Sequence, residues 1–218
     1  MKGLLIKDLM LLKRQKATLV MIVFFVIFLS VNNTLPSAGI VAYVAVFFTM
    51  LAISSVSYDE FDNGYAFLFT LPITIKTYVL EKYLFALLAV CGSCLLSGGF
   101  LFIGGQGAQE EGFMGFVAGF GLMMFLLIAV MMPLQLKFGV EKSRLMGLLL
   151  GILGGGVGVL CMTSFRQSGR LEDVIDTLQA MEGQLNGGVL AFFGVCLVIL
   201  AYLVSIMVSI HIMKRRDF

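Results

Sequence analysis

The chain has 218 residues, of which 60% are hydrophobic and 13% are charged, and its mean hydropathy is +1.02. A soluble domain of this size could not bury so much apolar surface, so the composition excludes an ordinary water-soluble protein and predicts a lipid-embedded fold. The formal net charge of +2 says little by itself, because in a membrane protein the placement of the cationic residues matters more than their sum.

Six apolar runs follow one another along the chain, and none contains Asp, Glu, Lys or Arg. A helix of about 20 residues reaches about 30 Å, the thickness of the hydrocarbon core of a bilayer. A transmembrane β-barrel would show short alternating segments instead. We therefore predict an all-α integral membrane protein that forms a single transmembrane domain over residues 1–218. Its six predicted transmembrane helices are residues 17–35, 39–57, 83–105, 113–134, 145–165 and 188–212.

The cationic residues indicate the orientation of these spans. If both termini share a side, 13 of the 15 Lys and Arg residues fall on that side, and only Arg166 and Arg170 fall on the other. By the positive-inside rule, both termini are then cytoplasmic, in a multi-pass protein of the plasma membrane. The lysines before the first run would also fit a signal peptide, but that run is long and no clear small-x-small cleavage site follows it.

A polar segment, residues 58–82, separates the second and third predicted spans. Apolar residues between Tyr58 and Thr70 recur in steps of three and four, which predicts a helix in the interface plane with its acidic face toward the cytosol. Pro72 prevents its continuation, and Thr74 is well placed to cap a new helix that runs into the third span. The alternative is a solvated loop that binds no partner.

Two further segments outside the spans have amphipathic patterns. Residues 1–16 alternate leucines with basic residues, which predicts a basic interfacial helix along the inner leaflet; a frayed basic tail that only sets orientation is the alternative. Residues 165–188 form the only sizeable extracellular segment, where apolar residues again repeat at helical steps. That second helix would either cover the outer surface or gate an exit path.

Glycines recur four residues apart in the fourth and fifth predicted spans. Small residues at this spacing let helix backbones approach closely, so we expect packing within the bundle, with a subunit interface or a sliding seam as the alternatives. The predicted helix-packing residues are Gly115, Gly119, Gly147, Gly151 and Gly155.

The sequence contains no recognisable catalytic or metal-binding motif. It has no G-x-x-x-x-G-K-[ST] pattern, so the chain cannot hold nucleotide phosphates in the P-loop manner. The lone His211 is expected to pack at the cytosolic end of the last span, and Cys91 and Cys94 to pack within an apolar helix. We therefore expect no enzymatic activity, no bound cofactor or metal and no nucleic-acid partner.

The segment FDNGYAFLFTLPITIKTYVLEKY, residues 61–83, resembles the signature between the second and third spans of ABC type-2 membrane subunits. MKGLLIKDLMLLKRQK at the amino terminus and MMPLQLKFGVEKSR between the fourth and fifth spans agree with the same family. The resemblance covers nearly the whole chain. It implies the permease subunit of an ATP-driven exporter, built from two membrane subunits, identical or paralogous, and two cytosolic ABC ATPases that bind the ATP and Mg.

The resemblance also implies that the polar segment is the coupling helix, which docks in a cleft of the ATPase, and that the link between the fourth and fifth spans makes a shorter contact. Exposed acidic residues would mainly steer the partner, whereas Phe61 and Tyr65 would be the energetic anchors. The predicted ATPase-contact residues are Asp59, Glu60, Phe61, Asp62, Asn63, Gly64, Tyr65, Lys137, Glu141 and Lys142.

The cargo is indicated only as a class. The chain contains 20 Phe and 14 Met, and Met-rich surfaces suit adaptable contact with apolar molecules. Compact members of the resembled family include exporters of amphipathic peptides such as phenol-soluble modulins, so a hydrophobic or amphipathic cargo, a peptide first, is expected. A secondary transporter normally needs ionisable residues within its spans. That class and a non-transporting membrane anchor or sensor are the alternative functions.

Overall fold

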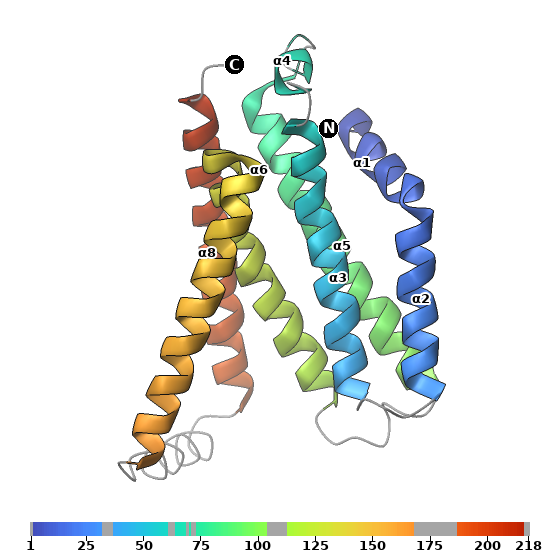
Figure 1. Cartoon of the computed structure of the whole chain (residues 1–218), viewed down its shortest axis with the longest axis vertical. Helices are drawn as coiled ribbons and strands as arrows, with labels where there is room; N and C mark the ends of the chain where they lie inside the picture. Colours follow the sequence, from blue (N-terminus) through green and yellow to red (C-terminus); the bar gives the residue numbers. More distant parts are fainter. Residues whose placement is uncertain are drawn as a thin grey trace.

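A computed structural model describes residues 2–31, 37–60, 64–68, 70, 73–103, 113–167 and 187–215. Every regular element within these ranges is an α-helix, as predicted. The beginning of α1 and the end of α8 lie at the same end of the helical bundle as α4 (Figure 1), and we call this the α4 end. The helices are α1 Lys2–Arg14, α2 Lys16–Val31, α3 Ser37–Glu60, α4 Gly64–Leu68, α5 Ile75–Ile103, α6 Phe113–Gln167 and α8 Gly187–Lys214.

Four helical stretches are long and apolar enough to cross a membrane: Ser37–Glu60, Ile75–Gly99, Phe113–Gly139 and Phe192–Lys214. A shorter apolar helix, Lys16–Ser30, accompanies them. The second half of α6 runs back along the bundle (Figure 1), but most of its side chains lie outside the described set. The structure therefore supports a multi-pass membrane protein, and the number of six spans stays a prediction.

Helix α6 reverses direction at Gly139. This residue has φ 77° and ψ 174°, a backbone conformation outside the helical region that is essentially restricted to glycine. A Cβ at this position would stand 2.7 Å from Oε1 of Glu60, at the end of α3. Gly139 thus permits both the reversal of the chain and the close approach of α3.

Helix α5 provides much of the core. Tyr78, Tyr83 and Ala86 of this helix are almost completely buried, and they belong to the same apolar cluster as Ala45 and Ala52 of α3. Small side chains on α3 let the two backbones come close, which replaces lipid contact by van der Waals contact between helices. The opposite surfaces remain apolar and exposed, as expected for helices that face lipid.

A buried set of hydroxyl groups fastens α8 to α5 and α6. The Tyr83 hydroxyl lies 2.6 Å from Oγ of Ser205 and 2.8 Å from Oγ of Ser209. Ser205 donates to the carbonyl of Ala129 at 2.6 Å, and the Tyr202 hydroxyl donates to the carbonyl of Tyr83 at 2.7 Å. Hydrogen bonds of this kind satisfy polar groups that lipid could not satisfy, so they favour one arrangement of the three helices.

The start of α5 confirms the predicted cap. The backbone N–H of Thr77 donates to Oγ1 of Thr74 at 3.3 Å, and the N–H of Tyr78 donates to the Thr74 carbonyl at 3.0 Å. These are the bonds that an N-cap residue supplies to the first turn. The amino-terminal helix is also present as α1, and a turn at Gln15 joins it to α2.

The predicted helix over residues 58–70 is wrong in its start. Tyr58, Asp59 and Glu60 continue α3, since residues 54–60 contain neither glycine nor proline to end that helix. A separate short helix, α4, begins at Gly64, where a Cβ would stand 2.5 Å from the carbonyl oxygen of Asp59. Glycine is required there for this close approach.

The glycines predicted to pack helices behave differently from one another. A Cβ on Gly147 would meet Cε of Met131 at 2.7 Å, so Gly147 packs the two halves of α6 together. Gly115 and Gly119 are exposed, and a Cβ added to either would meet no described atom of another helix or side chain within 4 Å. Bundle packing is therefore not seen for them, and a subunit interface stays a prediction. The surroundings of Gly151 and Gly155 lie outside the described residues, as does most of the predicted segment 165–188.

We predict that Gly139→Ala destabilises the protein by about 1–3 kcal/mol, because alanine is strained at this φ and ψ and its Cβ would collide with the Glu60 carboxylate. The apparent unfolding midpoint in detergent should fall. Gly119→Ala is the matched control, since nothing described lies within 4 Å of its added methyl group. Equal midpoints for the two variants would contradict the requirement for glycine at position 139.

Candidate functional site

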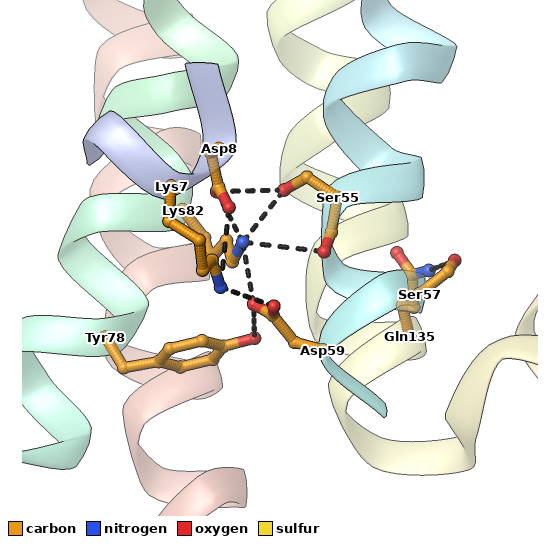
Figure 2. A network of polar contacts seen from close by, with 8 residues as sticks. All are labelled: Lys7, Asp8, Ser55, Ser57, Asp59, Tyr78, Lys82 and Gln135. Carbon is orange, nitrogen blue, oxygen red and sulfur yellow. Dashed lines mark hydrogen bonds and ion pairs between the residues drawn. The ribbon is translucent and has the colours of Figure 1, made fainter. Parts of the chain in front are cut away.

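Four charged side chains meet at the α4 end, where α1, α3 and α5 come together (Figure 2). Two are lysines and two are aspartates, so their formal charges cancel. Ser55 of α3 and Tyr78 of α5 complete the hydrogen bonds around them. We call this set the charged cluster, and its ionic members are Lys7, Asp8, Asp59 and Lys82.

Lys82 is the centre of the charged cluster. Its side chain is only 1% exposed, and its Nζ lies 2.5 Å from Oδ2 of Asp8 and 2.8 Å from Oδ2 of Asp59. The same Nζ donates to Oγ of Ser55 at 2.9 Å. An ammonium group has three protons, and these three oxygens give each of them an acceptor. A buried charge is tolerated only under such compensation.

The two aspartates have further partners. Oδ1 of Asp59 lies 2.5 Å from Nζ of Lys7, which also lies 3.5 Å from Oδ1 of Asp8. The Tyr78 hydroxyl donates to Oδ2 of Asp59 at 3.2 Å, and the Ser55 hydroxyl donates to Oδ2 of Asp8 at the same distance. Lys7 is 35% exposed, whereas both aspartates are buried. The cluster is thus closed toward the bundle and reaches the surface through Lys7.

This arrangement ties α1 to the membrane-spanning helices. Asp8 is on α1, Asp59 on the last turn of α3, and Lys82 on the second turn of α5. If α1 moved away, Asp8 would be separated from Lys82 and a buried charge would lose a partner. The charged cluster therefore fixes the position of α1 more specifically than apolar contact could.

Sequence reasoning missed the charged cluster. By the positive-inside rule, Lys7 and Lys82 are only two of the cytosolic positive charges, and no sequence pattern assigns a role to Asp8. A signal was available, because Asp8 is the only acidic residue among the first 16 residues and so interrupts a basic segment. Its partner could not be found from the sequence, since Lys82 lies 74 residues further along the chain.

Glu81 is buried beside the charged cluster without being part of its ion pairs. Its side chain is 1% exposed, and neither carboxylate oxygen has a hydrogen-bond partner among the described residues. A buried carboxylate in this situation is unfavourable in its charged form. Glu81 is therefore the one described acidic residue here whose burial the neighbouring contacts do not explain.

A second set of contacts at the α4 end joins the last turn of α3 to the reversal of α6 at Gly139. The Glu60 carboxylate lies against Gly139, where its Oε1 would be 2.7 Å from an added Cβ. One turn earlier in α6, Nε2 of Gln135 donates to Oγ of Ser57 at 2.7 Å. The end of α3 and the link between the two halves of α6 are therefore neighbours, although Gly139 comes 79 positions after Glu60 in the sequence.

The predicted ATPase-contact residues divide into buried and exposed sets. The expected exposure of Asp59 is wrong, since Lys7 and Lys82 hold its carboxylate inside the bundle. Tyr65 is also buried, with its ring edge-on to Tyr78 at 5.9 Å between centroids, so it fastens α4 to α5 rather than standing at the surface. Glu60 is half-buried.

The exposed set lies on the link within α6. Lys137, Glu141 and Lys142 are all exposed, and Nζ of Lys137 lies 5.0 Å from the centroid of the Phe138 ring. Gly64 begins α4. The remaining predicted contacts, Phe61, Asp62 and Asn63, lie outside the described residues.

Comparison with known families decides the identity of this helical bundle. The sequence model of the family described as ABC-2 family transporter protein matches residues 3–214. The chain belongs to the ABC-2 transporter family. Comparison with curated proteins and with solved structures gives no match. The matched residues include all four ionic members of the charged cluster and the reversal of α6 at Gly139. The charged cluster therefore lies within the matched part of this ABC-2 permease.

We predict that Lys82→Met destabilises the ABC-2 permease by about 3–5 kcal/mol, because it leaves two buried carboxylates without their shared partner. Lys76→Met is the matched control, since Lys76 is on the same helix but exposed. Apparent unfolding midpoints in detergent at equal protein concentration would measure the difference. A loss no larger than that of Lys76→Met would show that the ion pairs do not hold the helices together.

For Glu81→Gln we expect an unfolding midpoint equal to or above that of the unchanged permease, since an amide of the same shape removes a buried charge that has no hydrogen-bond partner among the described residues. Asp8→Asn is the comparison, because it removes the charge of an equally buried carboxylate that is paired with Lys82. That variant should unfold at a lower temperature. If both variants lost stability to the same extent, Glu81 would have an ionic partner after all.

Proposed function

We propose that this ABC-2 permease is the membrane subunit of an ATP-driven exporter in the plasma membrane. A separate cytosolic ABC ATPase binds the α4 end, which makes both termini cytoplasmic, and a second permease subunit completes the transporter. The cargo is hydrophobic or amphipathic, with an amphipathic peptide as the favoured class. ATP and Mg are bound by the ATPase, and this chain contributes no catalytic group.

One observation carries the proposal beyond family membership, namely the contact between Glu60 and Gly139. It joins the end of α3 to the link between the two halves of α6, which supports a single docking surface that includes both segments. A partner bound there would touch the ends of α3 and of both halves of α6. A single docking event could then move several membrane-spanning helices at once.

The helices at this surface are suited to transmit a displacement. Helix α3 runs without a break from Ser37 to Glu60, which corresponds to about 36 Å at about 1.5 Å per residue. Helix α5 begins at Ile75, close to the same end, and is capped by Thr74. Because the charged cluster joins α1, α3 and α5, a push at the α4 end would be shared by all three helices.

Secondary transport is the competing function, and Glu81 is the observation that favours it. A buried carboxylate such as that of Glu81, which has no hydrogen-bond partner in the described part of the chain, is the kind of group that a proton-coupled carrier uses. The two classes are separated by their energy source. Efflux that survives depletion of ATP but stops after addition of a protonophore would favour a carrier, and the opposite pattern would favour the ABC exporter.

We predict that the double variant Lys137→Glu/Lys142→Glu inserts normally but binds the ATPase about tenfold more weakly. Two exposed charges are reversed at the proposed docking surface, and each exposed charge pair contributes about 0.2–1 kcal/mol. The measurement is recovery of the ATPase with the tagged permease at matched membrane levels, together with the rate of ATP hydrolysis in the recovered complex.

Lys214→Glu is the control for that variant. Lys214 is exposed at the end of α8, near the same end of the bundle but on neither polar link. The control should recover as much ATPase as the unchanged permease does. Full recovery and full ATP hydrolysis in the double variant would exclude the link within α6 from the docking surface.

A further inference from the structure

Two buried carboxyl groups at the α4 end face each other without a donor between them. Asp8 of α1 and Glu81 of α5 are 0% and 1% exposed, and their side chains lie within hydrogen-bonding distance of each other. Oδ1 of Asp8 and both carboxylate oxygens of Glu81 nevertheless have no hydrogen-bond partner among the described residues. The reason is that an ionised carboxylate only accepts hydrogen bonds, so two of them have no proton to share.

The charge balance around this pair is incomplete by one proton. Lys7 and Lys82 carry positive charges that Asp8 and Asp59 already cancel. An ionised Glu81 would leave one negative charge over in a place that is closed toward the bundle, and a buried charge without compensation is strongly unfavourable. One proton on Glu81 would restore neutrality and would also supply the missing donor to Oδ1 of Asp8.

The other charged groups around Glu81 do not take the place of this proton. Those that act on it are Lys82 on its own helix and Asp8 and Lys7 on α1. The ammonium group of Lys82 is already engaged with Asp8, Asp59 and Ser55, so all three of its protons are in use. Glu60 of α3 lies against Gly139 of α6. The described ionisable side chains of α6 and α8 at this end are exposed, namely Lys137, Glu141, Lys142, His211 and Lys214.

We propose that Glu81 and Asp8 bind one proton between them, with Glu81 as the donor and Oδ1 of Asp8 as the acceptor, and that this proton holds α1 against α5. The proton comes from water at the α4 end, which the charged cluster reaches through Lys7, and it returns to water on the same side. The site needs neither the ATPase nor transport, so it goes beyond the proposed function.

Loss of the proton would act on the position of α1. It leaves two adjacent carboxylates, one on each helix, and like charges at this separation repel each other. Helix α1 has little apolar packing to oppose that repulsion, since Leu4 is its one described residue in the buried apolar core. The amino-terminal helix should therefore be held firmly at low pH and loosen as the pH rises.

The bound proton can be observed directly, because a protonated carboxyl group has an infrared absorption band that a carboxylate lacks. The permease in phosphatidylcholine nanodiscs is compared with Glu81→Gln, whose amide has the same shape and can still donate to Asp8. Ordinary carboxyl groups are ionised above about pH 6. The difference spectrum at about pH 6 should show one protonated carboxyl group, and its band should disappear toward about pH 9, where lysines keep their charge.

Asp8→Asn distinguishes a shared proton from one that burial alone places on Glu81. Without the charge of Asp8, an ionised Glu81 completes the balance of the cluster. Measured against Asp8→Asn/Glu81→Gln, the midpoint for loss of the band should move to lower pH by at least about one unit, since a neighbouring like charge has been removed. Glu141→Gln is the matched control, because Glu141 is an exposed carboxylate at the same end, and it should leave the midpoint unchanged.

Hydrogen–deuterium exchange of the α1 backbone amides reports whether the proton holds the helix. The unchanged permease and Glu81→Gln are compared at equal pH, so that the intrinsic pH dependence of exchange cancels. Exchange in α1 should be equal in the two proteins at about pH 6 and about tenfold faster in the unchanged permease at about pH 9. Exchange in α8 should be equal at both pH values.

Three results would overturn the proposal: no protonated carboxyl group in the difference spectrum, an unchanged band midpoint in Asp8→Asn, or equal α1 exchange in the unchanged permease and Glu81→Gln at every pH. Comparison of α1 with α8 within the unchanged permease needs no substitution, so poor folding of a variant would not remove the test. Because no measurement involves the ATPase or a cargo, failure here would leave the proposed function untouched.

Discussion

The requirement that buried charges cancel is the constraint on which the α4 end of this permease depends. Lys82 is surrounded by apolar helices, so its ammonium group must find carboxylates within hydrogen-bond distance. Those carboxylates come from two different helices, one of them α1, which spans only residues 2–14. Helix α1 contributes one buried side chain, Leu4, to the apolar core that α3, α5, α6 and α8 share, and the ion pairs of Asp8 and Lys7 add a specific electrostatic restraint on its position. A conservative change such as lysine to arginine would not preserve the geometry, because a planar guanidinium directs its protons differently.

Polar contacts are concentrated at the α4 end, and this distribution has a mechanical consequence. The charged cluster, the cap at Thr74 and the contact of Glu60 with Gly139 all restrain the ends of helices. Further along, many apolar side chains are exposed, and apolar contact resists rearrangement less than a hydrogen bond does. We infer that the α4 end moves as one body and that rearrangement during a transport cycle takes place mainly in the apolar part of the bundle.

Features with a local cause could be predicted from the sequence. The helical class follows from uninterrupted apolar runs, and the cap at Thr74 follows from a proline two residues earlier and a helical pattern after it. Features with a distant cause could not. Asp59 was expected at the surface because its neighbours in sequence are polar, whereas its burial depends on lysines 52 residues before it and 23 residues after it. The sequence pattern predicts that Tyr65 faces a partner, whereas its ring packs inward against Tyr78 within the apolar core.

The last turn of α3 contacts the first half of α6, the charged cluster and the link between the two halves of α6. Ser57 contacts Gln135 in the first half of α6, Asp59 contacts the lysines of the charged cluster, and Glu60 contacts Gly139 at the link within α6. Successive residues of a helix are about 100° apart, so these three side chains leave the same turn on different faces. A displacement of this turn cannot alter one contact and spare the others unless the helix unwinds. The first half of α6, the amino-terminal helix and the proposed docking surface therefore all have contacts within the same four consecutive residues, 57–60.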